Sequence, residues 1–117
     1  MEHDIVDLIQ KLPEYFVPER AKGTHVTAQL NLQKETTEYW TLQIADQQCF
    51  VSKGKTEKPQ LELTAKAEDL LAVLSGQLSA SRAYMQGKLH LRGSMLQALK
   101  ISEFFNIPAD LMKNIKM

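Results

Sequence analysis

The sequence predicts an α+β fold: a five-stranded sheet of mixed but mainly antiparallel strands, with helices packed on one face. Three observations predict it. Apolar and polar residues alternate in five separate segments, as in strands that bury one side only. The first three segments follow one another through short polar turns, whereas stretches of helical spacing separate the last two. A length of 117 residues suits one domain, so residues 1–117 are expected to fold as a single unit.

The chain begins with a predicted helix. Apolar residues recur at helical spacing over residues 3–12 and predict an amphipathic helix there. Pro13 is expected to end or kink this helix, because proline lacks the backbone donor that a helix interior needs. Residues 14–21 suit a further short helical turn, and Gly23 provides its stop.

The next three segments predict an antiparallel meander. Residues 24–32 and 40–44 alternate between apolar and polar side chains, which predicts two half-buried strands joined by a polar hairpin loop at 34–37. The pair Asp46–Gln47 suits a tight turn, although it lacks the glycine that favours the primed turn types. A third strand is expected over residues 48–53.

Two more strands are predicted in the second half of the chain, over residues 61–65 and 88–92, with helices between them. If these strands are neighbours in one sheet, a helical crossover is expected to make them parallel. Because all five predicted strands alternate, one face of the sheet meets water and the helices must cover the other.

Capping signals mark the helices of the second half. An apolar face predicts a first helix that stops at Gly76, and Ser79 suits the cap of a second short one. A Ser-x-x-Gln capping box at residues 94–97 starts a third helix, which runs to about Phe105. Residues 110–117 suit a last helical turn or a frayed end.

Charge and cysteine content exclude several classes of protein. Lys plus Arg and Asp plus Glu both number 14, and this zero balance argues against nucleic acid as a partner and against strong electrostatic docking on anionic membranes. No stretch approaches the ~18 apolar residues that cross a bilayer, so no stable membrane insertion is expected. Cys49 is the single cysteine and the first residues are not those of a secretory signal, which predicts a cytoplasmic location.

The sequence carries no pattern typical of catalytic or metal-binding residues. His3, His25 and His90 are spread over the chain and form no zinc-binding pair. Cys49 is expected to pack as a small hydrophobe rather than to act as a nucleophile. Glycine is too scattered to form a phosphate-binding loop. We therefore predict no catalytic residue, no metal and no cofactor.

The late helices are rich in flexible apolar side chains. Met85, Met95 and Met112 occur there among several leucines. Methionine adapts to irregular cavities, which suits a site for a variable lipid tail. The same spacing also fits a plain packed core, so helical periodicity alone leaves both interpretations open.

An ordered set of motifs resembles the sterol carrier protein 2 family. Residues 70–78 read Leu-Leu-Ala-Val-Leu-Ser-Gly-Gln-Leu, and residues 83–95 read Ala-Tyr-Met-Gln-Gly-Lys-Leu-His-Leu-Arg-Gly-Ser-Met. This order is similar to the family's helix ending in Gly-Lys-Leu and its glycine-punctuated strand. Residues 17–23, Val-Pro-Glu-Arg-Ala-Lys-Gly, resemble its lead into the first strand, and residues 40–46 fit its second strand and turn. The similarity covers about residues 5–107.

The chain departs from the family pattern at three positions. Gln77 replaces the usual lysine, Gln47 replaces the usual glycine of the turn, and Ser94 stands where Asp or Asn is common. None of these changes removes an apolar residue. Ser94 also keeps the capping role of the residue that it replaces.

The resemblance implies a five-stranded sheet and helices with an apolar tunnel between them that takes sterols, fatty acyl chains or other lipids. It therefore implies non-catalytic binding or transfer of an apolar small molecule. The ligand-binding residues that it carries over are Leu70, Leu71, Leu74, Met85, Leu89, Leu91, Met95, Leu99 and Phe105. The alternative is an accessory, scaffold or dimerisation domain with a collapsed tunnel, which supports a lipid- or quinone-related pathway. A weak homodimer is a further expectation.

Overall fold

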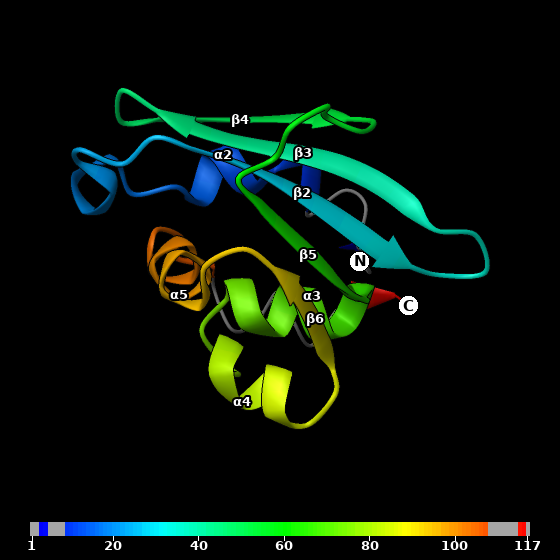
Figure 1. Cartoon of the computed structure of the whole chain (residues 1–117). Coiled ribbons are helices and arrows are strands. Elements are labelled where there is room, and N and C mark those ends of the chain that lie inside the picture. The colour runs from blue at the N-terminus through cyan, green and yellow to red at the C-terminus, as the bar shows by residue number, and fades with distance from the viewer. Residues whose placement is uncertain (1–2, 5–8, 108–114, 117) are drawn as a thin grey trace.

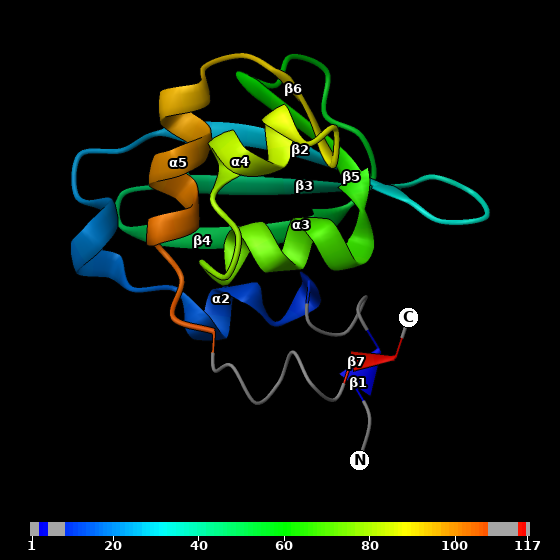
Figure 2. The same ribbon diagram turned by 90° about the horizontal axis from the view of Figure 1, so that it is seen from below.

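The sheet and its covering helices dominate the computed structural model, which describes residues 3–4, 9–107 and 115–116. Five strands pair in the order β4-β3-β2-β5-β6. The helices α3, α4 and α5 lie together on one side of this sheet (Figure 1). Seen from that side, they stand in front of the strands (Figure 2). The predicted fold class, an α+β protein with a five-stranded mixed sheet, is confirmed.

The predicted meander is present as β2 (Val26–Gln33), β3 (Glu38–Ala45) and β4 (Gln48–Lys53), all antiparallel. The turn between β3 and β4 is the predicted tight one. Asp46 and Gln47 have φ angles of 52° and 59°, the left-handed values of a primed two-residue turn. The turn therefore forms at Asp-Gln without the glycine that it usually contains.

The second half of the sheet differs from the sequence prediction in strand direction. β5 (Leu61–Lys66) pairs parallel with β2, whereas β6 (Leu89–Arg92) pairs antiparallel with β5. The expectation that β5 and β6 would be parallel is therefore wrong. Two helices, α3 and α4, connect these strands. α3 follows the end of β5, and α4 leads back to the same end of the sheet, where β6 begins. The chain thus re-enters the sheet at the end it had left.

The three helices of the second half begin and end as their capping signals predict. They are α3 (Ala67–Leu74), α4 (Ala80–Met85) and α5 (Met95–Glu103). The Ser79 hydroxyl accepts a hydrogen bond from the backbone N–H of Arg82 at 3.1 Å. In the same way, the Ser94 hydroxyl accepts from that of Gln97 at 3.3 Å. Each hydroxyl satisfies an N–H that the first turn of a helix leaves free.

The N-terminal region is more broken than predicted. Residues 9–10 are helical, followed by α2 (Leu12–Tyr15) and a 3₁₀ turn, η1 (Pro18–Ala21). The predicted helix is wrong at its start, because β1 (His3–Asp4) pairs there with β7 (Ile115–Lys116). Pro13 lies in the first turn of α2 instead of ending a helix, since that turn needs no N–H at this position.

Two parts of these predictions fall on residues that the structure does not describe. They are residues 5–8 of the predicted first helix and residues 110–114 and 117 of the predicted tail. At 115–116 the backbone is strand rather than helix.

A short antiparallel bridge ties the N-terminal segment to the end of α5. The N–H of Val17 donates to the carbonyl of Phe104, and the N–H of Asn106 donates to the carbonyl of Tyr15, both at 2.8 Å. The Phe16 ring packs against those of Phe104 and Phe105, with centroids 6.5 and 5.8 Å apart. Backbone and aromatic contacts thus hold this bridge together.

The hydrophobic core lies between the sheet and the helices. Alternate residues of β2 and β3 point into it, and α3 presents its apolar face from the other side. This confirms that the helices cover one face of the sheet. The largest fully buried side chains are Ile9, Leu12, Leu30, Leu32, Leu42, Ile44, Leu61, Leu63, Leu70, Leu71 and Leu74.

The opposite face of β2 is also buried, but by polar groups. Gln29 and Asn31 are only 6% and 7% exposed. The Gln29 amide donates to the Asn31 side-chain oxygen at 2.8 Å, and the Asn31 amide donates to Thr64 Oγ1 at 3.0 Å. The backbone N–H of Thr56 donates to the Gln29 oxygen at 3.2 Å. These bonds hold the β4–β5 connection, which crosses this side of the sheet (Figure 1).

Gly93 is the glycine whose replacement should cost the most stability. Its φ is +118°, and an added Cβ would lie 2.7 Å from the backbone oxygen of Gln60. We expect Gly93→Ala to lower the free energy of unfolding by about 2–4 kcal/mol, because backbone strain and a clash with a rigid neighbour combine. The measurement is urea unfolding followed by circular dichroism.

Gly87→Ala is the matched control, because Gly87 also has a positive φ, +76°, but no atom lies within 4 Å of the added Cβ. This variant should lower the free energy of unfolding by only about 1–2 kcal/mol, the cost of a left-handed backbone conformation for alanine. Equal losses for the two variants would contradict the predicted clash.

Candidate functional site

Several surface hollows have volumes within the roughly 300–1,000 Å³ of small-molecule sites, and the two of greatest volume are described first. The first, the α5 hollow, measures about 620 Å³ and lies between η1, the end of α3 and α5. The second, the hairpin hollow, measures about 660 Å³ and lies between the β2–β3 hairpin and the start of α3. The α5 hollow is lined by Arg20, Ser75, Gly76, Leu78, Ser79, Leu99, Ser102, Glu103, Phe105 and Asn106. The hairpin hollow is lined by Gln33, Lys34, Glu35, Thr36, Glu38, Lys66, Ala67 and Glu68.

Three apolar side chains meet in the α5 hollow: Leu78 from the α3–α4 connection, Leu99 from α5 and Phe105 from the segment after α5. Leu78 follows the stop of α3, where its N–H bonds to the carbonyl of Ala72 at 3.1 Å. Leu99 is half-buried on α5 and packs against the core, and Phe105 is 4% exposed. The bridge to Phe16 fixes Phe105 in place. An apolar group in this hollow would thus contact side chains that belong to the edge of the core.

Polar groups form the rim of the same hollow. The Arg20 guanidinium donates to the backbone oxygen of Glu103 at 3.1 Å, which holds η1 against α5. The hydroxyl of Ser102 donates to a carbonyl of its own helix, and so does that of Ser75. The arrangement suits an amphipathic molecule whose apolar part lies inside and whose polar part remains at the surface.

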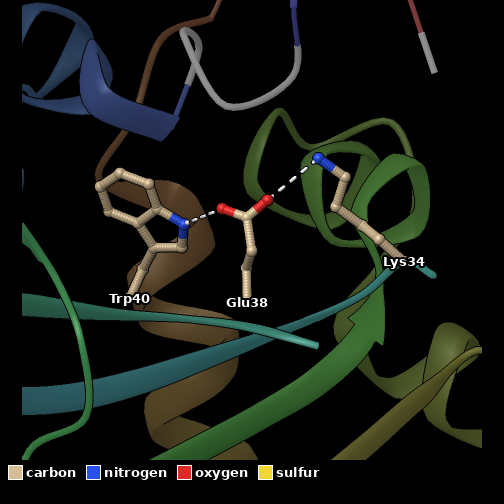
Figure 3. A network of polar contacts seen from close by, with 3 residues as sticks. All are labelled: Lys34, Glu38 and Trp40. Atoms are coloured by element: carbon tan, nitrogen blue, oxygen red, sulfur yellow. Dashed lines mark hydrogen bonds and ion pairs between the residues drawn. The ribbon is translucent and has the colours of Figure 1, made fainter. Parts of the chain in front are cut away.

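The hairpin hollow has a different chemistry, since Ala67 is the one lining residue with an apolar side chain. Lys34 Nζ lies 3.1 Å from Glu38 Oε2, and the indole N–H of Trp40 donates to Glu38 Oε1 at 3.4 Å (Figure 3). The hydrogen bond from Lys34 holds the pKa of Glu38 below its usual range. Charged side chains therefore line this hollow, and two of them, Lys34 and Glu38, pair with each other.

The nine residues predicted to bind a ligand fall into three groups in the structure. Those from α3, with Leu89 and Phe105, are buried in the core, whereas Leu91, Met95 and Leu99 are half-buried against it. Met85 is 85% exposed at the end of α4. Two of the nine, Leu99 and Phe105, meet in the α5 hollow.

Other residues of the α5 hollow were not predicted. Leu78 carried a signal, because it is an apolar residue placed two positions after the glycine that stops a helix. Arg20 carried none. Its place depends on a hydrogen bond to Glu103, 83 positions away, and local sequence periodicity does not report such a contact.

The described part of the chain holds little reactive chemistry. Among these residues no group of three or more His, Cys, Asp or Glu side chains could hold a metal ion. Burial raises the pKa of the Cys49 thiol to about 12, so the thiolate that a nucleophile requires is scarce at neutral pH. Within the same residues no helix is both long and apolar enough to cross a membrane.

Comparison with known proteins places the chain in a family. The model of the SCP-2 sterol transfer family matches residues 7–106. The chain therefore belongs to this family. It is also 28% identical over 65 residues to the non-specific lipid-transfer protein-like 1 of Caenorhabditis elegans, which covers 56% of this chain. The chain spans 55% of the length of that relative.

Solved structures of similar fold include free-standing and fused domains. Palmitated SCP2L2 from Aedes aegypti, solved by NMR in solution, has a TM-score of 0.65 and 27% identity, with 85% of this chain and 88% of that chain covered. The sec-alkylsulfatase Pisa1 from Pseudomonas sp. has a TM-score of 0.74 at 14% identity. That match covers 84% of this chain but 16% of the sulfatase, and it shows the fold alone.

Cys49 should be chemically inert in the folded protein. Because burial raises its pKa to about 12, we expect it to react with iodoacetamide at mildly alkaline pH more than about 100-fold more slowly than a free cysteine. Unfolding in guanidinium chloride should restore the ordinary rate. Mass spectrometry after timed quenching measures both rates, and fast labelling of the native protein would contradict the prediction.

Glu38 should stabilise the protein at neutral pH but not in acid. Its folded-state pKa lies below the ordinary value of 4.5, so its contribution is present above that pH and is lost as the pH falls through the folded-state value. We expect Glu38→Gln to lower the free energy of unfolding by about 0.5–1 kcal/mol at neutral pH, as for a partly exposed ion pair, and to have little effect in strong acid.

Urea unfolding at both pH values measures the effect, and Glu35→Gln is the control because Glu35 is an exposed carboxylate of the same hairpin. Equal destabilisation of Glu38→Gln at both pH values would show that the ion pair is not its cause.

Proposed function

We propose that this protein binds a lipid, either a sterol, a fatty acyl chain or a similar apolar molecule, and carries it without catalysing a reaction. The observation that supports this most is the meeting of Leu78, Leu99 and Phe105 in a hollow of about 620 Å³ at the edge of the core. Membership of the SCP-2 sterol transfer family supports the same class of ligand. In this proposal the protein acts in the cytoplasm.

The proposed path of the apolar chain runs from the α5 hollow inward, between α3 and the sheet. Burial of apolar surface drives binding at about 25 cal/mol per Å², so a long acyl chain could gain several kcal/mol in gross terms. Side chains that now pack the core would move aside to form the tunnel. They are the remaining predicted ligand residues of the core and its edge, Leu70, Leu71, Leu74, Leu89, Leu91 and Met95.

A fatty acyl chain is supported as one ligand by the Aedes aegypti relative, whose structure was solved in palmitated form. The polar rim of the α5 hollow suits a ligand with one polar end. Arg20 lies there beside the hydroxyl-bearing Ser75 and Ser102. We therefore propose that the polar end of the ligand remains among these side chains.

Leu99→Arg tests the site directly. It places a cation among the apolar side chains of the hollow, and an unpaired charge opposes an acyl chain. We expect the affinity for a fluorescent fatty acid to fall at least about tenfold, since about 1.4 kcal/mol of lost apolar contact is enough for that. A fluorescence titration measures binding, and circular dichroism checks that the variant is folded.

Phe50→Arg is the control. It is the same kind of change at a side chain that is 53% exposed on β4, where it pairs across the strands with Gln43 on the face away from the helices. It should bind the fatty acid as the unaltered protein does. A folded, unaltered protein that binds no fatty acid, sterol or phospholipid of a broad panel would refute the proposed function.

A further inference from the structure

The zero net charge of this chain conceals a strong separation of charge along it. Residues 70–102 contain no Asp or Glu but four basic side chains, those of Arg82, Lys88, Arg92 and Lys100. The rest of the chain therefore holds 10 basic and 14 acidic residues. The uninterrupted basic segment forms α4, β6 and most of α3 and α5.

The fold distributes these cations over different sides of the molecule. Arg82 and Lys100 are exposed on α4 and α5, two helices that contact each other. Arg92 stands opposite Glu62 across β5 and β6. Lys88 lines a separate hollow with acidic side chains of α3, so its charge is partly offset. Arg82 and Lys100 are thus the two cations that α4 and α5 expose, and Glu103, three positions after Lys100, is the one acidic residue of these two helices.

The same two helices expose large apolar side chains. Within the described residues four large hydrophobic side chains are exposed, and three of them lie here: Tyr84 at 52%, Met85 at 85% and Leu96 at 61%. α4 lies farther from the sheet than α3, with α5 beside it (Figures 1 and 2). Exposed apolar side chains beside cations are typical of surfaces that rest on a bilayer.

A hollow on α4 brings these features together. It measures about 550 Å³ and is lined by Ser79, Ser81, Arg82, Met85 and Gln86. It therefore offers one cation, neutral hydrogen-bonding groups and an apolar side chain, with no acidic residue. This chemistry matches a phosphate headgroup with the start of its acyl chains. The hollow shares Ser79 with the α5 hollow, so the two adjoin.

We propose that α4 and the adjoining side of α5 form a docking surface for anionic phospholipid bilayers. Arg82 and Lys100 attract the negatively charged headgroups, and Tyr84, Met85 and Leu96 enter the interfacial layer. The docked protein presents the α5 hollow beside the bilayer. The inference extends the proposed function, because a carrier must meet the surface that holds its lipid, but it rests on charge and exposure alone.

Vesicle sedimentation tests the proposal. The unaltered protein should sediment with vesicles made of equal parts phosphatidylcholine and phosphatidylglycerol, but not with phosphatidylcholine alone, and high salt should weaken binding. Each basic side chain near an anionic surface contributes about fivefold to binding, so Arg82→Gln with Lys100→Gln should weaken it about 25-fold. Tyr84→Gln with Leu96→Gln should weaken it as well.

Lys22→Gln with Lys58→Gln is the matched control, because it removes the same charge from exposed positions outside α4 and α5. This variant should bind the mixed vesicles as the unaltered protein does. Equal loss in this control, equal binding to both kinds of vesicle, or no binding to either would overturn the proposal. If the surface bound an acidic protein instead of a bilayer, the protein would bind neither kind of vesicle.

A second measurement separates this inference from the proposed function. Without vesicles, the variant lacking Arg82 and Lys100 should bind a fluorescent fatty acid as the unaltered protein does. Failure of docking with intact fatty-acid binding refutes the surface alone. Intact docking with no binding of any fatty acid, sterol or phospholipid of the panel refutes the carrier function alone.

Discussion

β2 lies at the centre of the sheet, antiparallel to β3 and parallel to β5, and side chains on both of its faces are buried. Its inward residues form the floor that the helices must cover. Its outward amides, Gln29 and Asn31, each need a hydrogen-bond partner, because a buried polar group without one costs about 1–3 kcal/mol. Thr64 of β5 and the backbone of Thr56 supply those partners. The register of β5 and the course of the β4–β5 connection are therefore coupled to the burial of β2.

The sequence predicted the positions of the strands and helices better than the directions of the strands. Alternation located β2 to β6, and serine hydroxyls located the starts of α4 and α5, because both signals act within a few residues. The antiparallel pairing of β5 with β6 was missed, since its direction depends on how two helices fold back on each other. The β1–β7 pair was missed for a related reason: two residues are too few to show a period, and their partner lies at the other end of the sequence.

For the candidate site, too, the sequence predicted local features but not how they come together in space. Helical spacing found the apolar side chains of α3 and α5, but spacing does not separate a core from the wall of a ligand site. Met85 was predicted to line the tunnel and is instead exposed on α4, a helix of six residues in which few apolar positions define a face. Summed charge also conceals a feature of the chain, because a total of zero coexists with residues 70–102, which contain basic side chains and no acidic ones. The distribution of charge, read along the folded elements, carries the information that the total lacks.

The bridge between Phe16 and Phe105 has a consequence for how the protein is made. A ribosome releases the chain from its N-terminus, so the backbone at Val17 has no partner until Phe104 has emerged. Likewise, the edge of β2 that pairs parallel with β5 has no partner until β5 has been synthesised. Contacts between residues so distant in the chain slow folding and leave apolar surface uncovered meanwhile. The nascent meander therefore has one open edge until β5 has emerged, and part of its apolar face stays uncovered, a state that chaperones recognise, until α5 has been synthesised.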